Sequence, residues 1–271
     1  MRGFALLLAA ALLTGCGPTL LFVGDPVLAA SLFDLDAFER SVDRVAERAG
    51  YRARFFWPPQ PSLETIDAIG AIEQHDAQVI VLSPYLSLTA HEFSSRFPGR
   101  SFFGYYGAAE LPNVTWIDFD PDPALREVGR LLAEWVFARP GRRVVAFVDE
   151  SSPTAKEEAA SLIAGYESGA EVGLERVAFS AAPTREDVRG RVRAAAAEND
   201  RALVLMLGSA TGWALEAARD EDVKLVLRHA TIPAHPGQVL YSVQDDLAVG
   251  LSAAFRADGP RVLVPSVVRR R

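Results

Sequence analysis

Short apolar runs alternate with amphipathic stretches along most of this 271-residue chain. Residues 34–50 are amphipathic: Leu35, Phe38, Val42 and Val45 recur at three- and four-residue steps, which predicts one apolar helix face. The apolar runs are short and continuous, which is typical of strands covered on both faces of a parallel sheet. Strands are predicted at 19–25, 51–57, 77–84, 100–107 and 113–120, and helices at 34–50, 62–75 and 123–141.

The same alternation starts again after residue 141. Strands are predicted at 142–150, 175–181, 201–208, 223–230, 238–244 and 261–268, and helices at 152–169, 184–200, 211–222 and 245–259. The sequence "DFDPDP" at 118–123 interrupts the pattern between the two series. We therefore expect an α/β fold of two doubly wound parallel-sheet lobes.

The N-terminus has the features of a secretory signal. Arg2 is followed by an apolar stretch, residues 4–13, that is too short to span a bilayer. "LTGC" at 13–16 resembles the bacterial lipobox, in which the cysteine is lipidated after the signal has been cut before it. We therefore expect residues 1–15 to be a lipoprotein signal peptide and Cys16 to be the lipidated N-terminus of a protein anchored in the bacterial cell envelope. A plain signal peptide, or a buried N-terminal strand with an incidental cysteine, is the alternative.

Composition and motifs exclude several classes of function. Cys16 is the single cysteine, so no disulfide framework is possible. The formal net charge of −7 and pI near 5.2 argue against nucleic-acid binding, which needs a basic face. The sequences GxSxG, HExxH and GxxxxGK[ST] are absent, and the four histidines show no metal-ligand spacing. "GSATG" at 208–212 is either a phosphate-binding loop or a simple turn. We expect neither an enzyme nor a bound metal or cofactor.

Polar and aromatic residues follow the predicted strands. Ligands of open parallel sheets bind beyond the carboxyl ends of strands, at the switch in strand order. Aromatic rings supply flat apolar area and carboxylates accept hydrogen bonds, which suits a small polar solute. Each position is also explained by an ordinary exposed loop or by packing. The candidate ligand-binding residues are Asp25, Phe33, Tyr85, Tyr106, Ser209, Trp213, His229, Gln244 and Asp245.

The start of the predicted helix at 245–259 holds two carboxylates. One of them has a plain structural role, because a carboxylate there caps free backbone N–H groups. We expect Asp246 to cap the helix, and Asp245, or Gln244 beside it, to reach the ligand.

Several segments, in order, resemble the basic membrane lipoproteins, a family with the type I periplasmic-binding-protein fold that includes nucleoside-binding lipoproteins of ABC importers. They are "FPGRSFFGYYGAAELPNVTWIDFD" (97–120), "AGYESGAE" (164–171), "GSATGWALEAARDE" (208–221) and "QVLYSVQDDLAVGL" (238–251). The resemblance implies two lobes joined by three crossovers near 118–121, 243–246 and 257–260, which close on the ligand by hinge motion. It implies an N-terminal lobe of 16–118 plus 244–258 and a C-terminal lobe of 119–243 plus 259–271.

The chain departs from the family at three places. The early "D…SFN" segment corresponds loosely to Asp25 and to "SLF" at 31–33, but Asp34 stands where the family has Asn. The family's sugar-binding Asp falls at or beside His229, and Leu162 stands where sugar-binding relatives have Arg. These departures count against both a nucleoside and a sugar as the ligand.

We expect a lipid-anchored, monomeric solute-binding protein that delivers a small polar ligand to an ABC permease, and the resemblance makes a nucleoside-like ligand one candidate. The alternatives are a lipid-anchored sensor or adaptor of the same fold, a member that has lost ligand binding, or an envelope enzyme, against which the missing catalytic motifs count.

Overall fold

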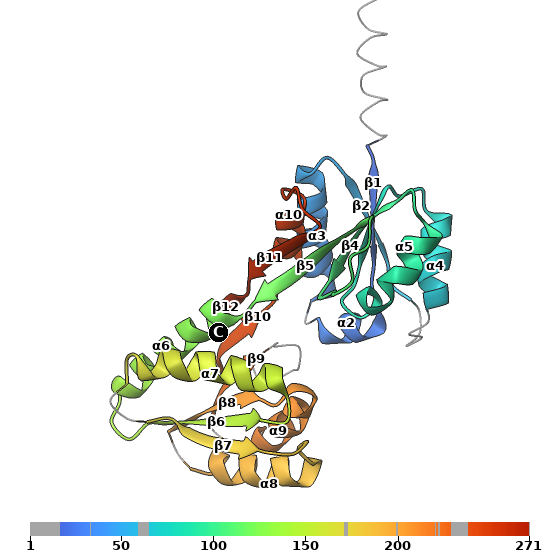
Figure 1. Ribbon diagram of the computed structural model, residues 1–271. Helices are drawn as coiled ribbons and strands as arrows, with labels where there is room; N and C mark the ends of the chain where they lie inside the picture. Colours follow the sequence, from blue (N-terminus) through green and yellow to red (C-terminus); the bar gives the residue numbers. More distant parts are fainter. Residues whose placement is uncertain are drawn as a thin grey trace, which may run out of the picture. The chain divides into compact units, whose positions relative to one another are not determined.

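The chain forms two compact units, each built on a six-stranded sheet (Figure 1). The computed structural model describes residues 17–32, 34–58, 65–170, 173–198, 200–219, 221, 223–228 and 238–270. Among these, unit 1 extends to Phe119 and resumes over Leu247–Val264, while unit 2 spans Asp120–Asp246 and resumes at Pro265. The chain therefore passes between the units three times.

Unit 1 has the strand order β11-β5-β4-β3-β1-β2, in which β2, β1, β3, β4 and β5 run parallel. Its strands are β1 (Thr19–Val23), β2 (Arg52–Phe56), β3 (Val79–Leu82), β4 (Ser101–Tyr105), β5 (Val114–Asp120) and β11 (Arg261–Pro265). Its helices are α2 (Pro26–Ser31), α3 (Leu35–Arg48), α4 (Thr65–Gln74), the 3₁₀ helix η1 (Leu86–Thr89), α5 (Ala90–Arg96) and α10 (Leu247–Ala254).

The central strand β1 shows why this sheet is covered on both faces. Successive side chains of a strand point to opposite faces. Leu20 and Phe22 enter a core with residues of α3 and α10, while Leu21 and Val23 enter a second core with residues of α4 and α5. All four are fully buried, which is the reason that β1 is a continuous apolar run.

Unit 2 repeats this arrangement, with the order β12-β10-β9-β8-β6-β7. Its strands are β6 (Arg143–Asp149), β7 (Glu175–Phe179), β8 (Arg201–Met206), β9 (Lys224–Arg228), β10 (Val239–Gln244) and β12 (Val267–Arg270). Its helices are α6 (Asp122–Phe137), α7 (Pro153–Glu167), α8 (Arg185–Ala196), the 3₁₀ helix η2 (Gly208–Ala210) and α9 (Thr211–Ala218).

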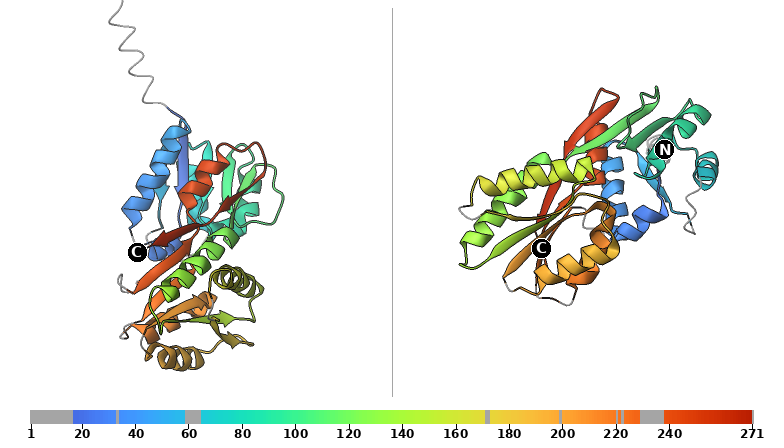
Figure 2. Two further views of the ribbon diagram at one scale, coloured as in Figure 1. Left: turned by 90° about the vertical axis from the view of Figure 1, so that its left-hand side faces the viewer. Right: turned by 60° about the horizontal axis from the view of Figure 1, so that its bottom comes forward.

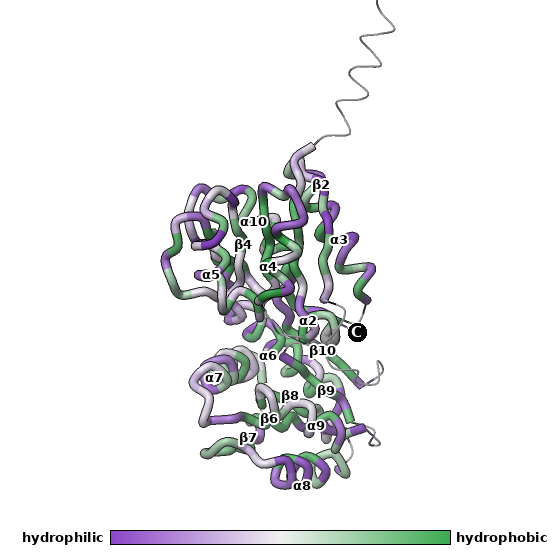
Figure 3. The backbone as a smooth tube through the Cα atoms, turned by 90° about the vertical axis from the view of Figure 1, so that its right-hand side faces the viewer, coloured by the Kyte–Doolittle hydropathy of each residue, from purple (hydrophilic) through white to green (hydrophobic). Residues whose placement is uncertain are grey.

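The two faces of this second sheet are covered by different helix pairs. Helices α6 and α7 pack on one face and α8 and α9 on the other. Figure 2 shows α6 and α7 side by side. A Cβ atom added to Gly165 of α7 would lie 2.1 Å from the Arg126 carbonyl oxygen of α6, so this glycine allows the two backbones to meet. Helix α8 is the most hydrophilic in Figure 3, and Val188, Val192 and Ala196 are its buried residues.

The end of the chain differs most from the sequence-based expectation. The single strand expected at 261–268 is two strands, because the chain leaves unit 1 between Val264 and Pro265 and then pairs antiparallel with β10. The third crossing therefore lies later than the 257–260 that the resemblance implied. The other two crossings lie at 119/120 and 246/247, within a few residues of the expected 118/119 and 243/244. Two short helices, α2 and α5, were also missed.

Candidate functional site

The strand order of unit 1 places its switch point between β1 and β3. Strand β2 lies on one side of β1, and β3, β4 and β5 follow on the other side. Residues that follow β1 and β3 therefore stand where ligands of doubly wound sheets bind. Val23 and Leu82 are paired at these ends, and the Ser83 backbone N–H donates to the Val23 carbonyl at 2.9 Å. The polar residues at this place are Asp25 and Ser83.

The Asp25 carboxylate is buried and only half satisfied. The residue is 2% exposed. Its Oδ1 accepts the backbone N–H of Leu28 at 2.8 Å and so caps α2. Its Oδ2 is buried and has no hydrogen-bond partner among the described residues. Buried polar groups are nearly always paired, so an orphaned carboxylate oxygen at a switch point marks a place for a donor from outside the chain.

Ser83 repeats this feature on the neighbouring strand. Ser83 is fully buried, and its Oγ also has no hydrogen-bond partner in the part of the chain that the structure describes. Ser87, four residues on, is equally buried but well bonded, since its Oγ donates to the Ser83 carbonyl at 2.8 Å and accepts the Tyr105 N–H at 2.9 Å. The contrast shows that the fold satisfies a buried serine hydroxyl where its role is structural.

Two tyrosines predicted as ligand contacts follow the same sheet edge. Tyr85 comes two residues after Ser83 and is 39% exposed. Tyr106 directly follows β4, is 45% exposed, and has φ of +58°, a left-handed conformation that costs free energy for a bulky residue. Its N–H donates to the Ile117 carbonyl at 3.1 Å, and its ring centre lies 5.8 Å from that of Phe119. Backbone strain of this kind is concentrated at functional sites.

In unit 2, an ion-pair cluster occupies the ends of β9 and β10. The Arg228 guanidinium donates to Glu158 of α7 at 2.8 Å and to both oxygens of Asp245, at 3.0 and 3.2 Å. The three side chains are 9%, 12% and 3% exposed. Burial alone lowers the pKa of Arg228, but the charges of Asp245 and Glu158 outweigh it and hold this pKa above its usual value.

This cluster shows the bonding of Asp245 within unit 2. Its carboxylate accepts hydrogen bonds from Arg228 and from the hydroxyl of Ser266, and its contact with a ligand stays a prediction. Asp246 pairs with Arg269 at 3.0 Å. The side-chain amide of Gln244 donates to Ser242 Oγ at 3.1 Å. Helix and strand patterns carry no signal for Glu158 or Ser266, because they do not show which polar residues meet.

The other predicted ligand-binding residues lie in different surroundings. Trp213 packs, half-buried, against the core of unit 2. Ser209 is exposed in η2 after β8, beside Gly208, whose φ is +53°. Cys16 with the predicted signal peptide, Phe33 and His229 lie outside the described residues.

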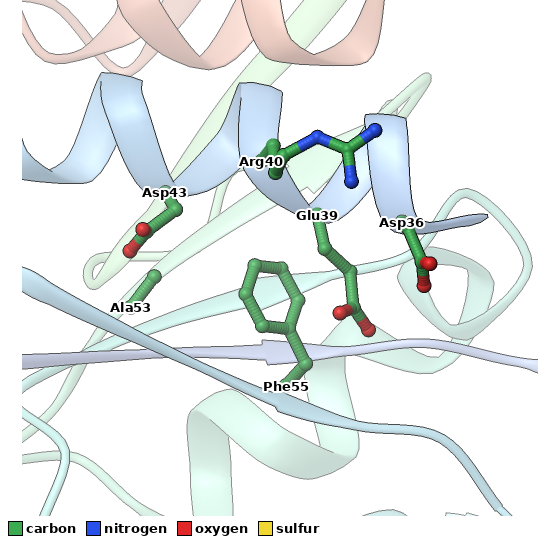
Figure 4. Close-up of a pocket in the computed structure, with 6 residues that line it drawn as sticks. All are labelled: Asp36, Glu39, Arg40, Asp43, Ala53 and Phe55. Carbon is green, nitrogen blue, oxygen red and sulfur yellow. The ribbon is translucent and has the colours of Figure 1, made fainter. Parts of the chain in front are cut away.

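A separate depression of about 350 Å³ lies in unit 1, between α3 and β2 (Figure 4). Asp36, Glu39, Arg40 and Asp43 of α3 surround it, with Ala53 and Phe55 of β2. Glu39 accepts the Trp57 indole N–H at 2.6 Å, so part of its charge is already bonded. The depression lies beside the edge strand β2 rather than at the switch point, and we assign no ligand to it.

The described ranges contain neither a candidate metal site nor a candidate membrane span. No group of three acidic, histidine or cysteine side chains is arranged there to hold a metal ion. No helix in these ranges combines the length and apolarity needed to cross a bilayer.

Comparison with known proteins identifies the fold. No family model matches this chain, and no curated protein sequence matches it. Among solved structures, it is similar to a transcriptional activator of the comK gene from Bacillus halodurans (TM-score 0.64, 11% identity, 93% of this chain and 89% of that chain). It is also similar to an ABC transporter solute-binding protein from Conexibacter woesei (0.60, 16%, 94% and 88%) and to a Caulobacter myo-inositol binding protein (0.54, 17%, 93% and 93%). The chain therefore has an α/β fold with two parallel-sheet lobes of the type I periplasmic-binding-protein kind, and at these identities the likeness establishes the fold alone.

Proposed function

We propose that this protein is a lipid-anchored solute-binding protein of the bacterial cell envelope. It captures a small polar molecule at the carboxyl edge of the unit 1 sheet and presents it to an ABC permease. The observation that carries this proposal is the pair of orphaned, buried polar atoms, Asp25 Oδ2 and Ser83 Oγ, at the switch point. The lipobox-like sequence around Cys16 and the likeness of the fold to ABC solute-binding proteins support it.

The resemblance of four segments to basic membrane lipoproteins supports the same role and makes nucleosides one ligand class to test. We propose that the chain is a divergent relative of that family. Its own site residues favour a ligand with hydrogen-bond donors, because Asp25 offers an acceptor oxygen.

The test is a thermal-shift screen of nucleosides, sugars, polyols, amino acids and amines against the purified protein. A ligand at 100 times its Kd adds about 2.7 kcal/mol to the free energy of unfolding. We expect at least one solute to raise the melting temperature, and we expect this rise to shrink in Asp25→Asn and Ser83→Ala. Asp67→Asn, which removes an exposed carboxylate in the first turn of α4, is the matched control. A screen without any hit, or hits that are equal in all variants, would refute the site.

The lipid anchor is tested separately in cells. Cys16→Ser removes the thiol that would carry the lipid, so the protein should remain unprocessed or leave the membrane fraction. Normal processing together with unchanged membrane retention would disprove the anchor.

A sensor of the same fold is the second candidate, since one solved neighbour is described as a transcriptional activator. The two roles share the ligand site but differ in the membrane partner. Cross-linking in cells decides between them: a permease as the captured partner supports import, and a signalling protein supports sensing.

A further inference from the structure

We propose that the ligand of unit 1 carries a protonated amine attached to a partly apolar or aromatic body. This inference rests on the proposed solute-binding function and adds the class of ligand. It starts from the charge of Asp25, beyond its hydrogen-bonding capacity.

Asp25 is a buried carboxylate that lacks a cationic partner among the described residues. None of the ion pairs found there includes it, and its one bond is the neutral Leu28 N–H. A buried carboxylate that has lost its water is stabilised most by an opposite charge at hydrogen-bond distance. A hydroxyl would satisfy Oδ2 as a donor but would leave the charge without a counterion.

The arginines at the described strand ends argue against an anionic ligand. Arg228 in unit 2 is already bonded to two carboxylates. In unit 1, Arg261 donates to Asp118 and to the Gly107 carbonyl, next to the end of β4. A carboxylate or phosphate ligand would have to displace one of these partners to reach an arginine. An ammonium group could pair with Asp25 without displacing an ion-pair partner among the described residues.

The surroundings of the same edge suit the rest of such a molecule. Tyr85 and Tyr106 leave ring surface exposed after β3 and β4, and ammonium groups are attracted to the faces of aromatic rings. Two aliphatic side chains from segments that follow the same strand ends are also exposed: Val27 of α2 at 55% and Leu88 of η1 at 71%. Exposed apolar groups after the strands whose edge also holds a buried charge fit an amphiphilic amine better than a densely hydroxylated sugar.

The experiment compares amines with alcohols of nearly the same shape on the unmodified protein. The pairs are tyramine with tyrosol, glucosamine with glucose, and putrescine with 1,4-butanediol, and 4-hydroxyphenylacetate serves as an anionic counterpart of the first pair. Affinities are measured by isothermal calorimetry at pH 7 and physiological salt. We expect at least one amine to bind at least tenfold more tightly than its alcohol, and the anion to show no binding.

Asp25→Asn then tests the residue. Asparagine keeps an oxygen for the Leu28 N–H but removes the charge, so amine affinity should fall at least tenfold while alcohol affinity changes less than threefold. Asp67→Asn should change neither. The melting temperature without ligand shows that each variant is folded, and the amine–alcohol comparison on the unmodified protein stands even if Asp25→Asn fails to fold.

The outcomes separate the two proposals. If a neutral or anionic solute from the wider screen binds and no amine does, or if amines and alcohols bind equally, the amine assignment is wrong and the solute-binding function stands. If neither panel contains a ligand, both proposals are wrong.

Discussion

Two buried serines of unit 1, Ser83 and Ser87, should respond in opposite directions to the same substitution. Both are 3% exposed or less, and both stand after β3. Ser87→Ala removes a hydroxyl that bonds three groups: it donates to the Ser83 carbonyl at 2.8 Å and the Leu82 carbonyl at 3.3 Å, and it accepts the Tyr105 N–H at 2.9 Å. Ser83→Ala removes a hydroxyl that has no partner among the described residues.

The magnitudes follow from these contacts. A buried N–H left without an acceptor costs about 1–3 kcal/mol, and the lost donor adds to this, so Ser87→Ala should lower the free energy of unfolding by about 2–3 kcal/mol. Burying an unpaired hydroxyl costs about 1–3 kcal/mol in proteins, and its removal leaves only a methyl-sized change, so Ser83→Ala should raise the stability by about 1 kcal/mol. The two variants should thus differ by about 3–4 kcal/mol.

Urea denaturation followed by tryptophan fluorescence, to which Trp57 and Trp116 of unit 1 contribute, measures the effect. The midpoint should move in opposite directions with an unchanged slope, which shows a change in stability rather than in the unfolded state. Thermal midpoints should shift by roughly 3–5 °C for each kcal/mol in a unit of this size. If Ser83→Ala destabilises unit 1 as much as Ser87→Ala does, then the Ser83 hydroxyl is bonded within the fold, and the argument for a ligand at the switch point loses half of its support.

The remaining predictions concern unit 2. Gly165→Ala places a Cβ atom 2.1 Å from a backbone oxygen and should lower the thermal midpoint by about 6 °C or more. Gly190→Ala in α8 adds a Cβ atom with nothing within 4 Å and should raise the midpoint by a few degrees. Equal shifts in the two variants would contradict the close packing of α6 and α7. Arg228→Ala removes the counterion of two buried carboxylates and should lower the free energy of unfolding by about 3–5 kcal/mol. Arg269→Ala, at an exposed ion pair, should lower it by less than about 1 kcal/mol. Similar losses in the urea midpoints of both variants would show that burial is not decisive. Hydrogen bonds from Arg126 and then Ser161 lower the pKa of Asp122, so the stability that this carboxylate adds is complete above the ordinary pKa of 3.8 and is lost as pH falls through the lower folded value. Asp122→Asn should therefore flatten the acid side of the plot of urea midpoint against pH. An unchanged plot would contradict this.

The architecture could be predicted from the sequence because it depends on local periodicity. Continuous apolar strands such as β1 and β6 are buried on both faces, so each is visible as an uninterrupted run, and amphipathic helices such as α3 show their core-facing stripe. Helices α2 and α5 were missed because they are only six and seven residues long, too short for the periodicity to emerge. The break at Ser266 between β11 and β12 was missed because an apolar run has the same pattern whether it lies in one sheet or is divided between two.

The candidate site was predicted only as a set of strand ends. Sequence order placed Asp25, Tyr85 and Tyr106 after strands, but it could not say which of many polar residues already have partners. Asp245 illustrates the limit: as a carboxylate between a strand and a helix it looked available, yet the pairing of β9 with β10 brings Arg228 to it from 17 positions away.

The sequence by itself determined the alternation of strands and helices, the two-lobed α/β class and the expectation of an envelope protein, because each rests on residues close together along the chain. The tertiary structure alone decided which polar groups are satisfied. It brought Glu158, Asp245 and Ser266 together in unit 2, and left Asp25 Oδ2 and Ser83 Oγ buried without a hydrogen-bond partner among the described residues of unit 1. Hydrogen bonding and charge pairing depend on distances between strands that are far apart in sequence, so the difference between an internal ion pair and a ligand site exists only once the sheets have formed.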